Sequence, residues 1–205
     1  MSEQNLSDIL TQGLRGLGED PATHPCETYL WFLRELSKWN TAYNLTAIRD
    51  PAQMVTHHLL DSLSVLPYIH GQRCLDVGTG AGLPGLVLAL ARPQSHWTLL
   101  DSKSKKIRFL QHIVLELKPA NVELVTSRAE DYEPPQLFST IVSRAFSSLV
   151  DFQRITAHLK AKEGHLLAMK GTRPEHELAE LIDVKPDVVK LRVPGLESER
   201  HVVIF

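Results

Sequence analysis

The chain has 205 residues and a mass of 23.0 kDa, the size of one domain or of one domain with a small helical extension. Hydrophobic residues make up 43% and charged residues 22% of the sequence, which excludes collagen-like, disordered and disulfide-scaffold proteins. The formal net charge of −2 excludes a strongly basic surface over the whole molecule. Any binding of nucleic acid must therefore depend on a local patch of positive charge.

The patterns of cysteine, histidine and apolar residues exclude further classes. Cys26 and Cys74 cannot form a disulfide framework, so a reduced, cytoplasmic protein is expected. The N-terminus lacks the basic region and long apolar stretch of a signal peptide, and the longest apolar run, 86–91, is too short to cross a membrane. The histidines are scattered without zinc-ligand spacing, so we expect no metal site.

Residues 1–70 are predicted to form an N-terminal helical cap, and residues 71–205 a second unit. Apolar residues across 29–39 recur at steps of three, four and seven, as on the buried face of a helix. The segment 39–46 interrupts this period and is expected to be a loop. An Asp-Pro pair at 50–51 then suits the N-cap and first position of another helix.

Beyond the cap, short apolar strands alternate with helices. This alternation predicts an α/β fold with a parallel sheet covered on both faces. Segments 188–193 and 201–205 are joined by a Pro-Gly loop and are expected to form an antiparallel hairpin at one sheet edge. The earlier strands are predicted at 74–77, 97–100, 122–125, 140–142 and 165–169, and helices up to 91 and at 103–118, 149–159 and 175–182.

A glycine-rich loop after the first predicted strand gives the strongest functional signal. The sequence continues from Val77 as Gly78-Thr79-Gly80-Ala81-Gly82-Leu83, and glycine lets a ligand come close to the backbone at the carboxyl end of a strand. Asp101 ends the next strand, nineteen residues beyond Gly82. A carboxylate there suits hydrogen bonds to both hydroxyls of a ribose, so the sequence predicts a nucleoside-containing cofactor.

Two classes of cofactor fit this loop. Residues 80–85 match the GxGxxG pattern of nicotinamide and flavin dehydrogenases. Asp76 favours S-adenosyl-L-methionine instead, because its carboxylate suits an ammonium group and would repel a pyrophosphate. The C-terminal hairpin also differs from the two parallel halves of a dinucleotide-binding fold. The methyl donor is therefore the favoured cofactor.

Ordered motifs run through nearly the whole chain. They are YNLT at 43–46, HHLLDSL at 57–63, DVGTGAGLPG at 76–85, LLDSKSKKIRFL at 99–110, SRAED at 127–131, SRAFSSL at 143–149, MKG at 169–171 and ERHVV at 199–203. In these motifs the chain resembles the RsmG (GidB) family, guanine-N7 methyltransferases of bacterial small-subunit (16S) ribosomal RNA. The resemblance implies a Rossmann-like, seven-strand methyltransferase sheet with an antiparallel C-terminal hairpin and an N-terminal helical cap, and S-adenosyl-L-methionine as the cofactor.

The resemblance also implies individual site residues. It places cofactor contacts at Gly78, Leu83, Ala129, Glu130 and Arg144. Gly80 and Asp101 join this cofactor-binding set from the argument on the glycine loop. In an open parallel sheet the ligand lies beyond the strand ends at the topological switch point, where the first and fourth strands should adjoin. Arg144 follows the fourth strand and suits either the methionine carboxylate or an RNA phosphate.

Three further features bear on RNA. Lys170 ends the fifth strand beside the expected cleft and is predicted to contact substrate RNA. The basic cluster at 103–108 begins a helix and is either a solvated face or a phosphate contact. His57 and Asp61 lie four residues apart on one helix, a spacing that allows a hydrogen bond between them.

The motifs that are missing narrow the reaction. Methylation of an exocyclic amine commonly uses a polar-Pro-Pro-aromatic motif after the fourth strand, but the sequence at 143–146 is Ser-Arg-Ala-Phe. Methylation of a pyrimidine carbon needs a thiolate, and neither Cys26 nor Cys74 is expected near the site. Guanine N7 carries a lone pair and no proton, so transfer needs alignment rather than a general base. No catalytic side chain is therefore assigned.

We therefore expect a cytoplasmic, monomeric enzyme that transfers a methyl group from S-adenosyl-L-methionine to N7 of a guanine in small-subunit ribosomal RNA, or in the small subunit itself. Three alternatives stay open. They are a methyltransferase of a small molecule, a dinucleotide-binding oxidoreductase and a non-catalytic binding module.

Overall fold

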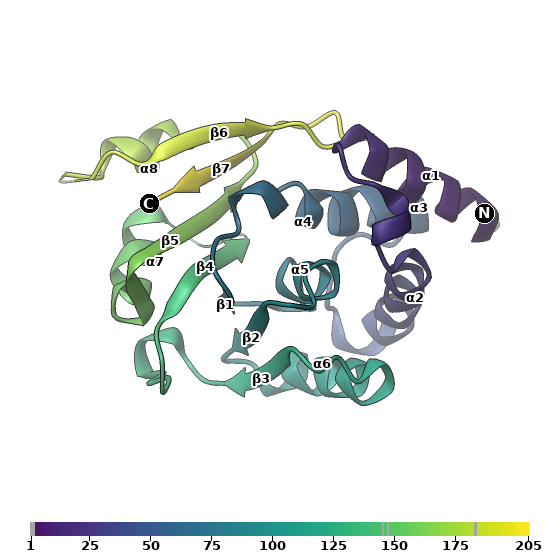
Figure 1. Cartoon of the computed structure of the whole chain (residues 1–205), viewed down its shortest axis with the longest axis horizontal. Coiled ribbons are helices and arrows are strands. Elements are labelled where there is room, and N and C mark those ends of the chain that lie inside the picture. Colours follow the sequence, from purple (N-terminus) through teal and green to yellow (C-terminus); the bar gives the residue numbers. More distant parts are fainter. Residues whose placement is uncertain (1–2, 145, 147, 183) are drawn as a thin grey trace.

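The framework of the molecule is one mixed sheet. In the computed structural model, which describes residues 3–144, 146, 148–182 and 184–205, its strands are β1 (Arg73–Val77), β2 (His96–Asp101), β3 (Val122–Thr126), β4 (Phe138–Arg144), β5 (Lys160–Lys170), β6 (Asp187–Leu191) and β7 (Arg200–Ile204). Their order is β3-β2-β1-β4-β5-β7-β6 (Figure 1). The first five strands are parallel, whereas β7 pairs antiparallel with both β5 and β6. The predicted α/β fold with an antiparallel C-terminal hairpin is confirmed.

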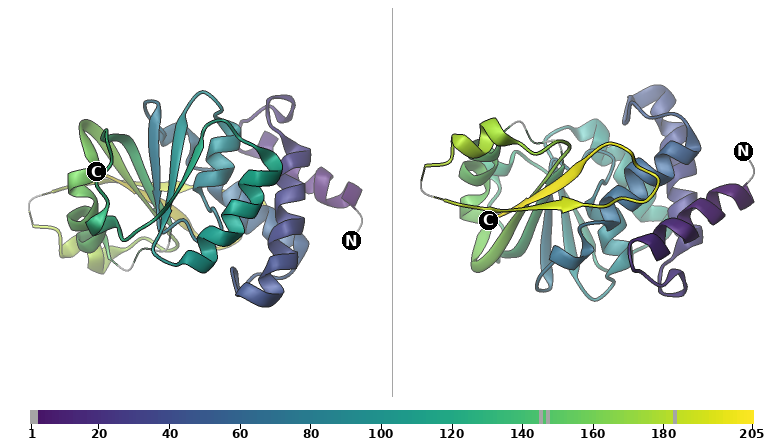
Figure 2. Two further views of the ribbon diagram at one scale, coloured as in Figure 1. Left: turned by 90° about the horizontal axis from the view of Figure 1, so that it is seen from below. Right: turned by 90° about the horizontal axis from the view of Figure 1, so that it is seen from above.

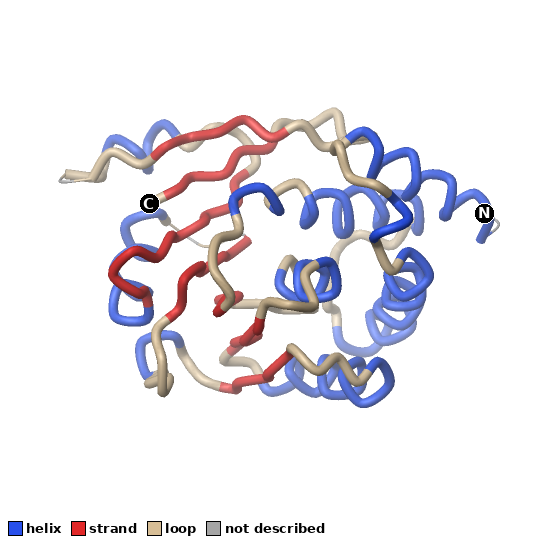
Figure 3. Tube along the Cα trace, viewed as in Figure 1, coloured by secondary structure: helices blue, strands red, loops and turns tan. Residues whose placement is uncertain are grey.

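Helices cover both faces of this sheet (Figure 3). They are α1 (Glu3–Gly16), α2 (Cys26–Tyr43), α3 (Pro51–Met54), a π-helical turn (Val55–Leu60), α4 (Asp61–Leu63), α5 (Gly85–Ala91), α6 (Ser104–Leu117), α7 (Leu149–Thr156) and α8 (Glu175–Ala179). Figure 2 shows the sheet from the side, with α2, α5 and α6 over one face and α7 over the other. Short 3₁₀ turns lie at Pro21–Thr23, Leu66–Tyr68, Ala129–Asp131 and Ala157–Leu159.

The N-terminal helices share a core with the sheet. Leu14 of α1, Phe32 of α2 and Leu60 are fully or almost fully buried in the same apolar cluster as Phe109 and Leu110 of α6. The aromatic rings of Phe32 and Phe109 lie 6.3 Å apart. The division between 1–70 and 71–205 stays a prediction about domain boundaries, and the segments on its two sides pack as one body.

The predicted loop at 39–46 is wrong in its first half, because α2 continues to Tyr43. Trp39 explains the extension: its ring packs 5.1 Å from that of Tyr43 and stacks 5.1 Å from that of His112. The Asn40 side chain then bonds the backbone N–H and C=O of Thr46 at 2.9 Å each, which closes the loop that follows. Asn44, with a left-handed φ of 50°, ends the helix.

The other predicted elements are present with shifted ends. Strands β4 and β5 are longer than predicted, and the helix predicted over 175–182 ends at Ala179. Asp50 accepts a hydrogen bond from the Gln53 amide and caps α3, as predicted. The helix that follows is interrupted by the π-helical turn, which the apolar pattern does not indicate.

Helix α5 packs against β1 at Gly85. A methyl carbon added there would lie 2.5 Å from Cβ of Asp76 and 2.5 Å from Cδ2 of Leu99, far closer than carbon atoms approach without displacement. The absence of a side chain at Gly85 thus lets the start of α5 approach the sheet, and this contact sets the end of the glycine-rich loop.

Gly85→Ala is therefore expected to destabilise the protein by about 1–3 kcal/mol through overpacking. The measurement is the free energy of unfolding in urea. Gly171→Ala is the control, because a methyl group added at Gly171 meets no atom within 4 Å. Equal stabilities of the two variants would contradict the close packing of α5 on β1.

Candidate active site

The glycine-rich loop lies at the carboxyl end of β1, between β2 and β4 in the sheet. The amides of Gly78 and Thr79 donate to the carbonyl of Leu100 at 2.8 and 3.0 Å, which holds the loop against the end of β2. Gly78, Gly80 and Gly82 have φ values of 70°, 59° and 87°. These left-handed conformations disfavour residues with a Cβ and explain the spacing of the glycines. The loop is at the topological switch point, as predicted.

Asp101 connects this loop to the end of β2. One of its carboxylate oxygens accepts from the Gly80 amide at 2.9 Å, and the other accepts from the Lys103 amide at 2.8 Å. The Lys106 ammonium lies 3.8 Å from the same carboxylate. Each carboxylate oxygen has two acceptor directions, so Asp101 can accept further hydrogen bonds from a ligand.

A pocket at this edge, here called pocket A, brings four of the predicted cofactor residues together: Gly78, Asp101, Ala129 and Glu130. Its remaining lining residues are Val77, Leu100, Ser102, Ser127, Arg128, Phe146 and Ile155. An added Cβ at Gly78 would meet no atom within 4 Å, so the space above the loop is open. Ala129 and Glu130 enter through the 3₁₀ turn after β3.

The residues of pocket A fit a nucleoside. The Asp101 carboxylate suits two ribose hydroxyls, the exposed Glu130 offers a further carboxylate, and the apolar side chains of Leu100 and Ile155 suit a flat base. Three predicted cofactor residues, Gly80, Leu83 and Arg144, lie outside this lining. Gly80 is bound to Asp101, and Leu83 is buried beneath the loop with 4% of its surface exposed.

A second pocket, here called pocket B, lies where β4, β5 and β7 meet the π-helical turn. Arg144 and Lys170 line it together with Thr46, Ala47, Ile48, His57, His58, Asp61, Met169, Gly171 and Arg200. Arg144 therefore faces the π-helical turn and the loop at 46–48. Phe146, two residues later, lines pocket A instead. Ala145 and Ser147 of the 143–149 motif lie outside the described residues.

Lys170 is already engaged in a salt bridge. Its ammonium lies 2.7 and 2.9 Å from the two carboxylate oxygens of Glu177 and donates to the Phe146 carbonyl at 3.2 Å. Only 10% of its side chain is exposed. The contact of Lys170 with RNA stays a prediction, and it would require Glu177 to release the ammonium. In the cluster at 103–108, Lys103, Lys105 and Arg108 are exposed.

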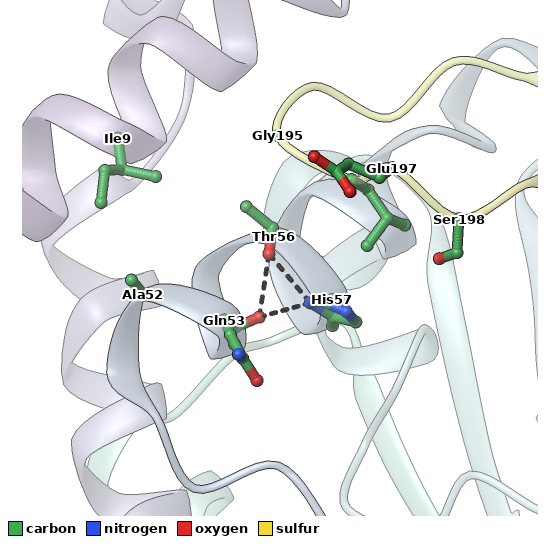
Figure 4. A pocket seen from close by; sticks show the side chains of 9 residues that line it. Ile9, Ala52, Gln53, Thr56, His57, Gly195, Glu197 and Ser198 are labelled. Atoms are coloured by element: carbon green, nitrogen blue, oxygen red, sulfur yellow. Dashed lines mark hydrogen bonds between the residues drawn. The ribbon is translucent and has the colours of Figure 1, made fainter.

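The hydrogen bond that the sequence allowed between His57 and Asp61 is not formed. Nδ1 of His57 lies 3.0 Å from the Gln53 carbonyl and 2.9 Å from Oγ1 of Thr56. Figure 4 shows this triangle at the wall of a third pocket, between α1 and the 195–198 loop. The Asp61 carboxylate is turned toward the sheet instead, where it meets Arg144 and Arg200.

The π-helical turn explains this arrangement. The Asp61 amide donates to the carbonyls of Thr56 and His58, not to that of His57 as an α-helical register would require. The His57 carbonyl accepts from Nη1 of Arg144 at 3.0 Å. The local change of register thereby gives Arg144 a backbone acceptor, and π-turns of this kind are frequent at functional sites.

Asp76 lies beneath the loop and organises it. The carboxylate is fully buried, and one oxygen accepts from the Thr79 hydroxyl at 2.6 Å and from the Gly85 amide at 2.8 Å. Its other oxygen has no hydrogen-bond partner in the described part of the chain. Asp76 does not line pocket A or pocket B, so its predicted contact with an ammonium group stays a prediction.

The absence of metal and membrane features concerns residues 3–144, 146, 148–182 and 184–205, which the structure describes. In these ranges three or more His, Cys, Asp or Glu side chains nowhere gather closely enough to hold a metal ion. None of the helices there is both long and apolar enough to span a membrane.

The fold is shared with solved methyltransferases. A SAM-dependent methyltransferase from Aquifex aeolicus superposes with a TM-score of 0.58 at 20% identity, over 78% of this chain and 95% of that chain. Fibrillarin from Aeropyrum pernix, solved with natively bound S-adenosyl-L-methionine, gives a TM-score of 0.55 at 13% identity, over 71% and 72% of the two chains. These similarities show that the chain has the Rossmann-like fold of these methyltransferases.

Sequence comparison identifies the family within this class. The family profile described as rRNA small subunit methyltransferase G (GidB) matches residues 26–203. A relative from Ectopseudomonas mendocina, named ribosomal RNA small subunit methyltransferase G, is 51% identical over 98% of this chain and 96% of its own length. The chain belongs to this family, which confirms the resemblance found in the motifs.

Asp76 gives the protein a specific dependence of stability on pH. Burial raises the pKa of the Asp76 carboxyl to about 6, whereas an unfolded aspartate has a pKa of about 3.9. The folded protein thus binds this proton more tightly than the unfolded chain. The stability contributed by the proton is full below about pH 4 and is lost as the pH rises through about 6.

Asp76→Asn removes this titration. Between about pH 4 and 7 the wild type should lose about 2 kcal/mol of unfolding free energy relative to the variant. Urea unfolding of both proteins across this range measures the difference. Parallel stability curves would show that Asp76 titrates equally in the folded and unfolded chains.

Proposed function

We propose that this protein transfers a methyl group from S-adenosyl-L-methionine to N7 of a guanine in small-subunit ribosomal RNA. The observation that carries the proposal is pocket A. It gathers Gly78, Asp101, Ala129 and Glu130 at the switch point of the sheet, in a chain that belongs to the rRNA small subunit methyltransferase G family.

The residues of pocket A would hold the nucleoside half of the cofactor. Asp101 would accept from the ribose hydroxyls while it keeps its bonds to the Gly80 and Lys103 amides, so the same carboxylate shapes the loop and binds the ligand. Glu130 would bind the adenine amine, and Gly78 leaves room for the ligand over the loop. When bound, the cofactor supplies an electrophilic methyl group on a sulfonium.

Pocket B would receive the methyl acceptor. The segment from Arg144 to Phe146 has pocket B at its first residue and pocket A at its last, so donor and acceptor would meet across the end of β4. Binding both reactants in fixed positions lowers the barrier of a direct transfer, and N7 needs no proton removed.

The cysteines support this choice of target over a pyrimidine carbon. Burial raises the pKa of the Cys74 thiol to about 12, and Cys74 is fully enclosed in β1. Burial also raises the pKa of Cys26, which lies at the start of α2. Neither thiol lines pocket A or pocket B, so a thiolate that adds to a pyrimidine ring is not provided by either one.

The similarities favour this function over the alternatives. The relatives are named for methylation of small-subunit ribosomal RNA, which argues against a small-molecule methyltransferase, an oxidoreductase or a non-catalytic module. The partner of the protein is then ribosomal RNA or the small subunit, and we propose that it acts as a monomer in the cytoplasm.

Asp101→Ala should weaken the binding of S-adenosyl-L-methionine by about 1–3 kcal/mol, because hydrogen bonds from the ribose to a carboxylate are lost. Calorimetric titration measures the affinity, and circular dichroism checks the fold. Asp8→Ala, at an exposed position on α1, is the control. In the wild type the 2′-deoxy analogue should bind more weakly than the ribose form. Equal affinities for the two would show that Asp101 does not bind the ribose.

The reaction product should be 7-methylguanosine in small-subunit RNA. The assay supplies a labelled methyl donor to small-subunit RNA, the small subunit, large-subunit RNA, transfer RNA and free nucleosides, and then identifies the labelled nucleoside by chromatography. A folded RNA should exceed free guanosine as substrate, because remote contacts contribute the binding energy that aligns the base. Label on an exocyclic amine, a ring carbon or a ribose hydroxyl would refute N7 as the target. Equal label on free nucleosides would refute RNA as the substrate.

A further inference from the structure

A single buried carboxylate joins two arginines at the same edge of the sheet, from β4 and β7, the strands on either side of β5. Oδ1 of Asp61 lies 3.0 Å from Nε of Arg200 at the start of β7, and Oδ2 lies 3.5 Å from Nη1 of Arg144 at the end of β4. Only 4% of the Asp61 side chain is exposed, against 26% for Arg144 and 21% for Arg200. The carboxylate therefore lies behind the guanidinium groups, which reach the surface of pocket B.

Both guanidiniums keep unused donors. Arg144 gives Nη1 to the His57 carbonyl and to Asp61, and Arg200 gives Nη1 to Ser198 and to the Glu199 carbonyl. Within the described ranges the Nη2 groups of both arginines have no hydrogen-bond partner. Planar guanidinium groups with free N–H donors match the oxygens of a carboxylate or a phosphate.

The charges around pocket B favour an anion. Lys170 is neutralised by Glu177, and Asp61 offsets one of the two arginines. His58 adds no charge, because burial and the neighbouring Arg144 lower its pKa to about 4. One net positive charge is left at the pocket, which suits one oxyanion of a ligand.

The backbone also holds Arg144, because Nη1 donates to the His57 carbonyl at 3.0 Å and to Asp61 at 3.5 Å. The π-helical turn directs the His57 carbonyl at Nη1 of Arg144, and Asp61 follows directly on this turn. The same short segment therefore supplies both acceptors of Arg144. Without Asp61, two like charges would face one another with no carboxylate between them.

We infer that Asp61 is a positioning residue that holds Arg144 and Arg200 as an oxyanion-binding pair in pocket B. The inference rests on the proposed function and deepens it. The oxyanion is either the carboxylate of the methyl donor or a phosphate of the target RNA, since both present the same chemistry to a guanidinium. Asp61 itself touches neither ligand.

The test compares Asp61→Asn with the wild type in two binding measurements. If the oxyanion is the cofactor carboxylate, the affinity for S-adenosyl-L-methionine should fall at least about tenfold, while decarboxylated S-adenosyl-L-methionine binds both proteins equally. If it is an RNA phosphate, the KM for small-subunit RNA should rise at least about tenfold with unchanged cofactor affinity. The salt dependence of RNA binding should then also become shallower, by about one phosphate contact.

Asp151→Asn is the matched control, because it removes an exposed carboxylate that pairs with a single arginine, Arg154, on α7. It should leave both affinities unchanged. Arg200→Gln is a second variant that removes the other end of the pair and covers the case in which Asp61→Asn does not fold. It should reproduce the loss, and in the double variant the two losses should not add.

The outcomes separate this inference from the proposed function. A wild type that methylates no ribosomal RNA refutes the proposed function. A wild type that does so, with variants at Asp61 and Arg200 that keep both affinities within about twofold of the wild type, overturns the inference. An equal loss of affinity for carboxylated and decarboxylated cofactor, with unchanged RNA binding, overturns it as well, because a general distortion of the site would then be the cause.

Discussion

The structure of the site depends on the conformation of the glycine-rich loop that follows β1, and one buried carboxylate holds this loop in place. Asp76 binds the Thr79 hydroxyl and the Gly85 amide with the same oxygen, so the two ends of the glycine-rich loop are held together. Helix α5 starts at Gly85 and can approach the sheet only because glycine has no Cβ there. Burial away from solvent disfavours the charged form of the carboxylate, and this raises the pKa of Asp76.

The loop and pocket A could be predicted from the sequence because the interactions that form them are local. Glycines at 78, 80 and 82 indicate a left-handed backbone conformation. The parallel pairing of β1 with β2 then places the aspartate at the end of β2 beside these glycines. The antiparallel pairing of β6 with β7 also follows from a hairpin at a sheet edge, whereas the hairpin alone does not determine that β7 rather than β6 pairs with β5.

Pocket B could not be predicted in the same way, because it is assembled from distant segments. Thr46, the π-helical turn, Arg144, Lys170 and Arg200 meet only after the sheet and the N-terminal helices have packed. Over six residues, apolar spacing does not distinguish a π-turn from an α-helix. The sequence therefore does not indicate that the His57 carbonyl is free to accept a hydrogen bond from Arg144. The apolar pattern does not predict the continuation of α2 through Trp39 for a related reason, since the stacking partner of Trp39, His112, is remote in the chain.

Three buried aspartates share one physical role in this molecule. Asp76 binds a hydroxyl and an amide, Asp101 binds two amides near a lysine, and Asp61 binds two arginines. Each carboxylate fixes groups that would otherwise move or repel, at the edge where β1, β2 and β4 end. The proposed methyl transfer to N7 requires no proton transfer, so the rate of methyl transfer depends on how well the donor and the acceptor are aligned. Carboxylates fixed by these contacts meet that demand, since Asp101 lines pocket A while Asp76 and Asp61 hold the loop and the arginines, and no general acid or base is assigned.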